Sequence, residues 1–132
     1  GFLNQAENSD INSPDKLFIQ EGKKVFKQVI PIVASLIEDH LQKNNIPIDT
    51  VSRLWLHQAN LSMNQLIAKK LLGRDPGAEE MPIVLDEYAN TSSAGSIIAF
   101  HKYSDDLNVN DIGVICSFGA GYSVGSIIVQ KI

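Results

Sequence analysis

The chain has 132 residues, of which 44% are hydrophobic and 20% charged, which is the size and composition of one globular domain. A formal net charge of −4 and a pI of about 5.2 argue against nucleic acid as a partner, because binding to phosphates needs a basic surface. The chain has no run of about 18 apolar residues, and its first residues lack a basic region followed by an apolar one, so we expect neither a membrane span nor a signal peptide.

The start of the chain and its cysteine content bear on its context. The chain begins with Gly1 instead of Met, so we expect a fragment, a processed product or an incompletely ordered chain. Residues 1–14 are polar and predict a loop or linker remnant, which leaves 15–132 as one domain. The single cysteine, Cys116, excludes an internal disulfide and is typical of a reducing cytoplasm, where we expect the protein to act.

Hydrophobic spacing predicts the secondary structure in chain order. Apolar residues recur at helical spacing from Asp15 to Asn44 and predict a long helix. Pro31 falls inside this pattern and should kink the helix near Lys27, because proline removes one backbone hydrogen bond. The later pattern predicts a strand Val51–Leu56, a helix Leu61–Leu72 closed by Gly73 in a left-handed conformation, a minimal strand Pro82–Leu85, a helix Ser92–Leu107, a strand Ile112–Ser117, a turn Gly119–Gly121 and a strand Ser123–Val129.

The alternation of short strands and helices predicts an α/β fold. Its first strands should form a parallel sheet with right-handed crossovers, and the last two an antiparallel hairpin at one edge. His57 ends the first predicted strand, Asn90 follows the second, and the segment Phe118–Gly121 follows the third. Because ligands of open α/β sheets bind at the carboxyl ends of parallel strands, these three segments should meet at one edge.

The residue types at this edge are suited to stabilising anions. A neutral His57 can donate a hydrogen bond or accept a proton. The Asn90 amide can donate to an oxygen that gains negative charge, and the backbone N–H groups of Gly119, Ala120 or Gly121 can form an oxyanion hole. Two donor sets aimed at two oxygens suit acyl transfer or enolate formation on a thioester, although the chain has no evident nucleophile.

Each of these residues also has a purely structural interpretation. A lone histidine at a strand end is commonly structural, and Asn60 and Asn90 each precede a helix that they can cap. The glycines near 120 can simply shape a hairpin. Cys116 lies in an apolar strand and is expected to be a buried, inert thiol, and two further histidines fall in predicted helices, where we expect them at the surface or in packing: His40 and His101. The coincidence of three motifs at one edge is what favours a functional site.

The motifs resemble those of a known enzyme family. The segment His57–Leu61 (HQANL), the segment Asn90–Ala94 (NTSSA) and the segment Phe118–Tyr122 (FGAGY) with Gly125–Ser126 look like the C-terminal half of a β-ketoacyl-acyl-carrier-protein synthase III. The resemblance covers roughly residues 18–132. It implies one half of a thiolase-like fold, a mixed sheet with helices on its faces and a C-terminal antiparallel hairpin.

The resemblance also implies a reaction and roles for individual residues. The reaction is the decarboxylative condensation of an acyl thioester with a malonyl thioester in fatty-acid or related acyl biosynthesis. His57 and Asn90 would hold the malonyl thioester carbonyl and stabilise the enolate. Gly119 and Ala120 would offer backbone N–H groups to the acyl-enzyme carbonyl. Asn60 would contact the pantetheine arm of the substrate, and Phe118 would also contact the substrate.

The implied partners are acyl-CoA, acyl carrier protein, the missing N-terminal half of the same enzyme and a second copy in a homodimer, with no metal or cofactor. The family's nucleophilic cysteine belongs to the N-terminal half, so we expect this chain alone to be inactive in condensation. Gly1 falls after the first strand of the C-terminal half, so the chain should need a partner segment, dimerise or be an excised domain.

The sequence departs from the family pattern at three positions. Cys116 lies in the strand before the glycine turn and is in the wrong place for the nucleophile. Ser62 replaces a basic residue that commonly contacts the carrier protein. Ala120 replaces a glycine, which narrows the range of backbone torsion angles allowed in that turn. Two alternatives therefore stay open: a non-catalytic ketosynthase-like partner subunit, and a related thiolase-fold enzyme of secondary metabolism.

Overall fold

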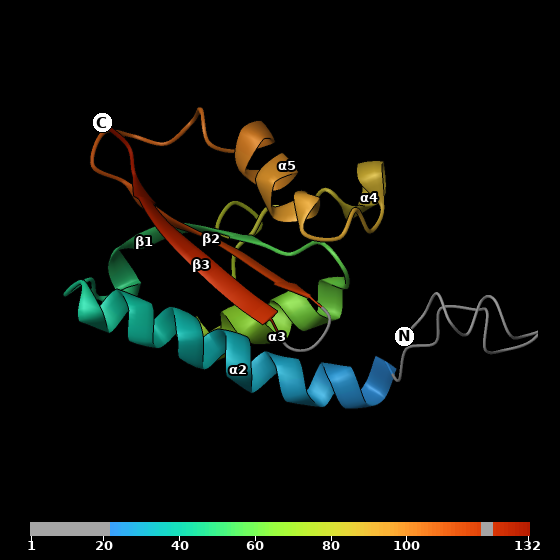
Figure 1. The fold of residues 1–132 in the computed structure, drawn as a ribbon. Coiled ribbons are helices and arrows are strands. Elements are labelled where there is room, and N and C mark those ends of the chain that lie inside the picture. Colours follow the sequence, from blue (N-terminus) through green and yellow to red (C-terminus); the bar gives the residue numbers. More distant parts are fainter. Residues whose placement is uncertain (1–21, 120–122) are drawn as a thin grey trace, which may run out of the picture.

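The computed structural model describes residues 22–119 and 123–132. Within them, helices and three strands follow one another along the chain (Figure 1). In chain order the elements are helix α2 (Gly22–Lys43), a 3-10 turn η2 (Ile48–Thr50), strand β1 (Val51–Leu56), helix α3 (Leu61–Leu72), helix α4 (Leu85–Tyr88), helix α5 (Ala94–Lys102), strand β2 (Ile112–Gly119) and strand β3 (Ser123–Gln130).

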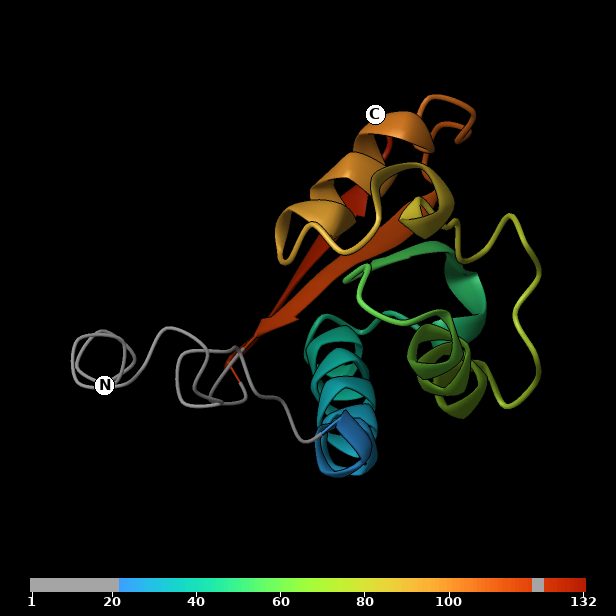
Figure 2. The ribbon, with the colours of Figure 1, turned by 90° about the vertical axis from the view of Figure 1, so that its right-hand side faces the viewer.

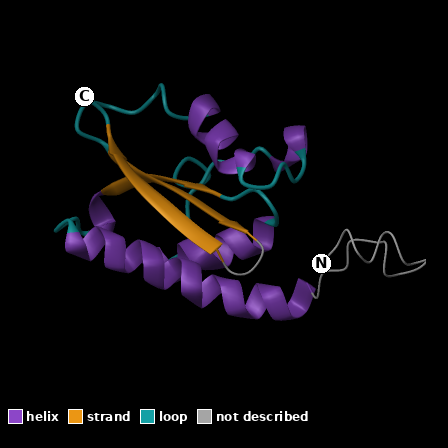
Figure 3. Ribbon diagram, viewed as in Figure 1, coloured by secondary structure: helices purple, strands orange, loops and turns teal. Residues whose placement is uncertain are grey.

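The three strands form one mixed sheet in the order β1-β2-β3 (Figure 3). β1 runs parallel to β2, with Leu56 opposite Cys116. β2 and β3 form the predicted antiparallel hairpin, paired from Ile112 with Gln130 to Gly119 with Ser123. Helices α2 and α3 cover one face of the sheet, and α5 with the short α4 lies on the other (Figures 1 and 2). This arrangement confirms the predicted α/β class with a mixed sheet, helices on its faces and a C-terminal hairpin.

Strand alternation divides the core between the two faces of the sheet. On the face under α2 and α3, Leu54 and Leu56 of β1 pack with Val114 and Cys116 of β2. On the opposite face Trp55 packs with three other buried residues: Val84, Ala99 and Ile115. β1 and β2 are buried on both faces, which explains why their sequences are nearly continuous apolar runs.

Several predicted helix and strand ends are confirmed. β1 and α3 have the predicted bounds, and Gly73 ends α3 with φ +72° in the left-handed region. The first described helix begins at Gly22 and ends at Lys43, continuing through Pro31. The predicted start of that helix and the linker over 1–14 lie outside the described residues. The kink at Pro31 and the domain boundary at residue 15 stay predictions.

The predicted strand Pro82–Leu85 is wrong. The chain is irregular up to Val84, and Leu85 begins α4. One backbone hydrogen bond joins the preceding stretch to β1, from the Leu54 N–H to the Glu80 carbonyl at 2.7 Å. The ladder does not continue because Pro82 has no N–H to donate, and the Val84 N–H donates to the Gln58 side chain at 3.0 Å. Asn90 therefore follows a short helix instead of a strand.

The helix predicted over Ser92–Leu107 is shorter, Ala94–Lys102. Its end coincides with a tertiary contact, because the Tyr103 carbonyl accepts hydrogen bonds from Arg53 Nη1 at 2.7 Å and from Trp55 Nε1 at 3.1 Å. Strand β2 is longer than predicted. It continues past Ser117 to Gly119, which was predicted to lie in a turn.

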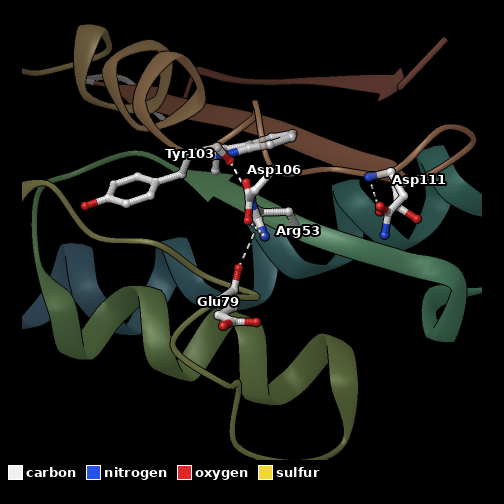
Figure 4. A network of polar contacts seen from close by, with 7 residues as sticks. Arg53, Glu79, Tyr103, Asp106 and Asp111 are labelled. Carbon is white, nitrogen blue, oxygen red and sulfur yellow. Dashed lines mark hydrogen bonds and ion pairs between the residues drawn. The ribbon is translucent and has the colours of Figure 1, made fainter.

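The buried side chain of Arg53 in β1 is the centre of a polar network (Figure 4). Its side chain is 9% exposed and pairs with both carboxylate oxygens of Asp106, at 2.5 and 2.9 Å. Its Nε also donates to the Glu79 carbonyl at 2.8 Å. Hydrogen bonding to this guanidinium lowers the pKa of the Asp106 carboxyl. Arg53 thus holds the loop before Pro82 and the segment after α5 on one strand.

We predict that Arg53→Met destabilises the fold by about 1–3 kcal/mol, because it removes the hydrogen bonds of a buried guanidinium to the carbonyls of Glu79 and Tyr103. Urea unfolding of the purified protein measures the change. Arg74→Met is the matched control: Arg74 also makes a bidentate pair, with Glu80 at 2.7 and 2.8 Å, but its side chain is 58% exposed. The control should change stability much less, and equal losses in the two variants would contradict the role assigned to burial.

Candidate functional site

His57 follows β1 directly and lies against Phe118 of β2. The imidazole is buried, with 6% of the residue exposed. Its ring centroid is 4.5 Å from that of Phe118, with the two planes inclined by 37°. The His57 carbonyl accepts a hydrogen bond from Asn64 Nδ2 at 2.9 Å, which fixes the backbone at the strand end. The structure therefore brings together two of the predicted site residues, from two adjacent parallel strands.

The environment keeps the imidazole neutral. Burial lowers the pKa of His57 below its ordinary value of 6.5, because desolvation disfavours the charged form. Within 22–119 and 123–132, its Nδ1 atom is buried and has no hydrogen-bond partner. Buried polar atoms are normally paired, so this unpartnered atom makes the His57 imidazole a candidate contact for a ligand. A neutral imidazole here can donate one hydrogen bond and accept one.

Gln58 connects the end of β1 to two later segments, the residue before α4 and the first turn of α5. It is fully buried, its Nε2 donates to the Leu56 carbonyl at 2.8 Å, and its Oε1 accepts the Val84 N–H. Gly95 in the first turn of α5 lies so close that a Cβ there would be 2.6 Å from the Gln58 Cβ. Sequence reasoning assigned Gln58 no role of its own. The available signal was a carboxamide two residues after Leu56, the last residue of the predicted strand.

Asn60 is exposed and caps α3. Its Oδ1 accepts the Met63 N–H at 3.1 Å and its backbone is extended, so the capping interpretation is confirmed. The predicted contact of Asn60 with a pantetheine arm stays a prediction. Four residues on, Asn64 is buried, and it is Asn64 that touches the His57 backbone. Sequence reasoning did not single it out.

Asn90 lies in an exposed turn between α4 and α5. Its Oδ1 accepts the Ser92 N–H at 3.0 Å, whereas the predicted role uses the amide N–H groups on the other side of the carboxamide. The N-cap of α5 is Ser93, so the interpretation of Asn90 as that helix's cap is wrong. This hydrogen bond lies within the turn itself, so the predicted approach of the Asn90 side chain to His57 stays a prediction.

The backbone of this turn adopts uncommon conformations. Ala89 has φ 54° and ψ −156°, and Ser92 has φ 58°. Positive φ is rare for residues other than glycine, and such strain persists only where the surroundings hold it. Thr91 also lies in the turn, and its Oγ1 is buried without a partner within the described part of the chain.

The predicted backbone donors are only partly described. Gly119 ends β2, is exposed, and a Cβ added there would meet nothing within 4 Å. Ala120 and Gly121 lie outside the described residues, so the oxyanion hole stays a prediction.

Cys116 lies in the hydrophobic core and does not line the candidate site. It is fully buried in β2 among the residues that face α2 and α3. Burial raises the pKa of its thiol to about 12, which leaves almost no thiolate near neutral pH. The inert interpretation is confirmed, and Cys116 is excluded as a nucleophile in this fold.

The other two histidines are placed as expected. His40 packs against the sheet, with Nδ1 2.7 Å from the Ser126 Oγ, and His101 is exposed on α5. In the part of the chain that the structure describes, no group of three or more His, Cys, Asp and Glu side chains is arranged to hold a metal ion. Nor does any helix there have the length and apolar character needed to cross a membrane. The expected absence of a metal or cofactor stays a prediction.

The depressed pKa of His57 predicts a pH-dependent stability. As the pH falls below 6.5, the unfolded chain binds a proton at this position before the folded chain does. The stability contributed by neutral His57 is therefore fully present above 6.5 and is lost as the pH falls toward the folded-state pKa. Urea midpoints of the protein and of His57→Gln, compared from about pH 8 to about pH 5, should show a shallower acid loss in the variant. His101→Gln, which changes an exposed imidazole, is the control, and parallel profiles for all three proteins would refute the expectation.

Cys116 should resist alkylation in the folded protein. We expect the peptide that carries Cys116 to stay unmodified by iodoacetamide at about pH 8 and to be modified fully once urea unfolds the chain. Peptide mass spectrometry measures both states. Equal labelling rates in the folded and unfolded protein would show that the thiol is accessible and reactive.

Comparisons with known proteins identify the family of the chain. The model of the family described as 3-oxoacyl-[acyl-carrier-protein] synthase III C terminal matches residues 41–131. The chain is 63% identical to a β-ketodecanoyl-[acyl-carrier-protein] synthase of Pseudomonas aeruginosa over 99% of its length and 37% of that protein. It is 36% identical to a β-ketoacyl-[acyl-carrier-protein] synthase III of Ehrlichia ruminantium, over 83% of the chain and 34% of the relative.

The fold itself has close counterparts among solved structures. The 3-oxoacyl-(acyl carrier protein) synthase III of Pseudomonas aeruginosa PAO1 superimposes with a TM-score of 0.78 at 23% identity, over 93% of this chain and 38% of that one. The thiolase-like fold expected from the motifs is thus confirmed. The chain spans about a third of the length of the curated relatives it matches. It belongs to the 3-oxoacyl-[acyl-carrier-protein] synthase III family and matches the C-terminal region of that family.

Proposed function

We propose that the protein containing this chain condenses an acyl thioester with a malonyl thioester, with loss of carbon dioxide. This chain would supply the groups that stabilise the developing anion. The observation that carries the proposal is the buried, neutral imidazole of His57, which lies against Phe118 and has an unpartnered Nδ1 among the described residues. Family membership supports the choice of a thioester as substrate.

The proposed chemistry follows from where charge develops. When the malonyl carboxylate leaves as carbon dioxide, the electron pair of the broken bond becomes part of a thioester enolate. Hydrogen bonds from His57 and from the Asn90 amide to the enolate oxygen would stabilise that charge. A neutral donor in a buried site is effective because its dipole is fixed before the reaction and is poorly screened by water.

The enolate would then attack the carbonyl carbon of an acyl group held as a thioester on a thiol, and the backbone N–H groups of Gly119 and Ala120 would bind the resulting oxyanion. Collapse of that intermediate would break the carbon–sulfur bond, release the thiolate and leave the β-ketoacyl product. Cys116 cannot hold that acyl group because it is fully buried with a raised pKa. We propose that the acyl-bearing thiol comes from the part of the protein that corresponds to the rest of the relatives' length. On this proposal the present chain alone does not catalyse condensation.

The relatives also suggest substrates and partners. The Pseudomonas aeruginosa relative is named for a β-ketodecanoyl product, so a ten-carbon product made from an eight-carbon acyl group is the first to test. We propose acyl-CoA as the acyl donor and malonyl-acyl carrier protein as the extender. Action in the cytoplasm as a homodimer, without metal or cofactor, is part of the same proposal.

Substituting the proposed anion-stabilising residues should separate the two half-reactions. In the full-length protein, His57→Ala and Asn90→Ala should each lower malonyl decarboxylation about 100-fold or more, the usual cost of losing one oxyanion donor. Acylation of the nucleophile by the acyl-CoA should persist, because that step does not form the enolate. Carbon dioxide release and the mass of the acyl-enzyme measure the two steps.

Two matched variants serve as controls. His101→Ala removes an exposed imidazole, and Asn44→Ala removes an exposed carboxamide that, like Asn90, makes one hydrogen bond with nearby backbone. Both should leave decarboxylation unchanged. Wild-type decarboxylation in His57→Ala, or loss of acylation in that variant, would overturn the assigned role.

A further inference from the structure

Two hydroxyl groups join α5 to β2 beside the Asn90 turn. The Oγ atoms of Ser96 and Ser117 are 2.5 Å apart, and each lies 3.1 Å from the carbonyl oxygen of Ser93. Ser96 is fully buried. A hydroxyl has one proton, so one serine donates to the Ser93 carbonyl while the other donates to its neighbour. The pair therefore works as a unit that holds one backbone group.

The pair connects the turn to the strand that carries Phe118. Neighbouring side chains of a strand point to opposite faces. Phe118 belongs to the core on the α2 and α3 side and its ring meets His57, so Ser117 faces α5. One dipeptide of β2 thus contacts the imidazole on one side and the start of α5 on the other.

The held carbonyl belongs to the residue that follows the strained turn. Ala89 and Ser92 have positive φ values, and Asn90 lies between them. The Ser92 carbonyl accepts the Gly95 N–H at 3.2 Å, and the Ser92 N–H donates to Asn90. These two bonds lie within the turn and the first turn of α5. The hydroxyl pair, by contrast, connects Ser93 to strand β2 through Ser117. It can therefore fix the position of the Asn90 turn relative to His57.

We propose that Ser96 and Ser117 are positioning residues, which through the Ser93 carbonyl hold the turn from which the Asn90 amide reaches the enolate oxygen. The proposal rests on the proposed function. Neither hydroxyl need touch the substrate. Their effect comes from geometry, since a donor misplaced by about 1 Å can cost about 100-fold in rate.

The test uses the full-length protein with Ser117→Ala, Ser96→Ala and the double variant. Each should lower kcat for malonyl decarboxylation about tenfold or more with KM unchanged, because only transition-state stabilisation is lost. Acylation of the nucleophile should keep its rate. The double variant should lose no more than either single one, because the two hydroxyls hold one carbonyl together. Ser117→Thr, which keeps a hydroxyl, should retain the wild-type kcat.

Ser126→Ala is the matched control. It removes a hydroxyl that bonds His40 at 2.7 Å, well away from the turn in sequence, and should leave kcat unchanged. A fall in acylation that parallels the fall in decarboxylation would show a general loss of folding and would overturn the proposal. An unchanged kcat in Ser117→Ala, or equal losses in Ser117→Ala and Ser126→Ala, would also overturn it.

Asn90→Ala separates failure of this inference from failure of the proposed function. If Asn90→Ala keeps full decarboxylation, the proposed role of Asn90 fails, whatever the serine variants do. If Asn90→Ala loses activity and Ser117→Ala does not, the positioning role alone fails. Combining Asn90→Ala with Ser117→Ala should give no loss beyond that of Asn90→Ala, because the serine acts through the asparagine.

Discussion

The parallel register between β1 and β2 is the constraint on which the candidate site depends. Leu56 is opposite Cys116, so the chain leaves both strands at the same edge of the sheet, with His57 and Phe118 as neighbours. Both strands are buried on both faces, and a shift by one residue would turn the apolar side chains of a strand to the wrong face. The contact between the imidazole and the phenyl ring is therefore maintained by the packing of the whole sheet.

Polar side chains in β1 and just after it hold in place the long connection between the parallel strands β1 and β2. Much of the crossover is irregular, so its backbone groups need partners outside helices and strands. Arg53 binds the carbonyls of Glu79 and Tyr103, and Gln58 binds the Val84 N–H. These bonds fix where α4 and α5 lie over the sheet, and with them the turn that carries Asn90.

Desolvation gives two titratable groups near this edge opposite pKa shifts. It lowers the pKa of His57 and raises that of Cys116, because burial disfavours the cation in one case and the anion in the other. Both groups are thereby kept neutral. For the imidazole this suits hydrogen bonding to a substrate anion, and for the thiol it prevents nucleophilic attack. The same physical cause thus favours His57 as a site residue and excludes Cys116.

Local sequence was sufficient where a single element decides the outcome. Apolar periodicity located β1 and α3, Gly73 marked the end of α3, and the HQAN motif identified His57 as the residue at the strand end. Tertiary structure decided the features that depend on distant partners. Pro82–Val84 is not a strand, because the Val84 N–H binds Gln58, and α5 ends early where the Tyr103 carbonyl binds Arg53. The Ser96–Ser117 pair joins residues 21 positions apart. Periodicity shows which face of an element is buried, but the partner of a backbone or hydroxyl group is known only once the chain has folded around it.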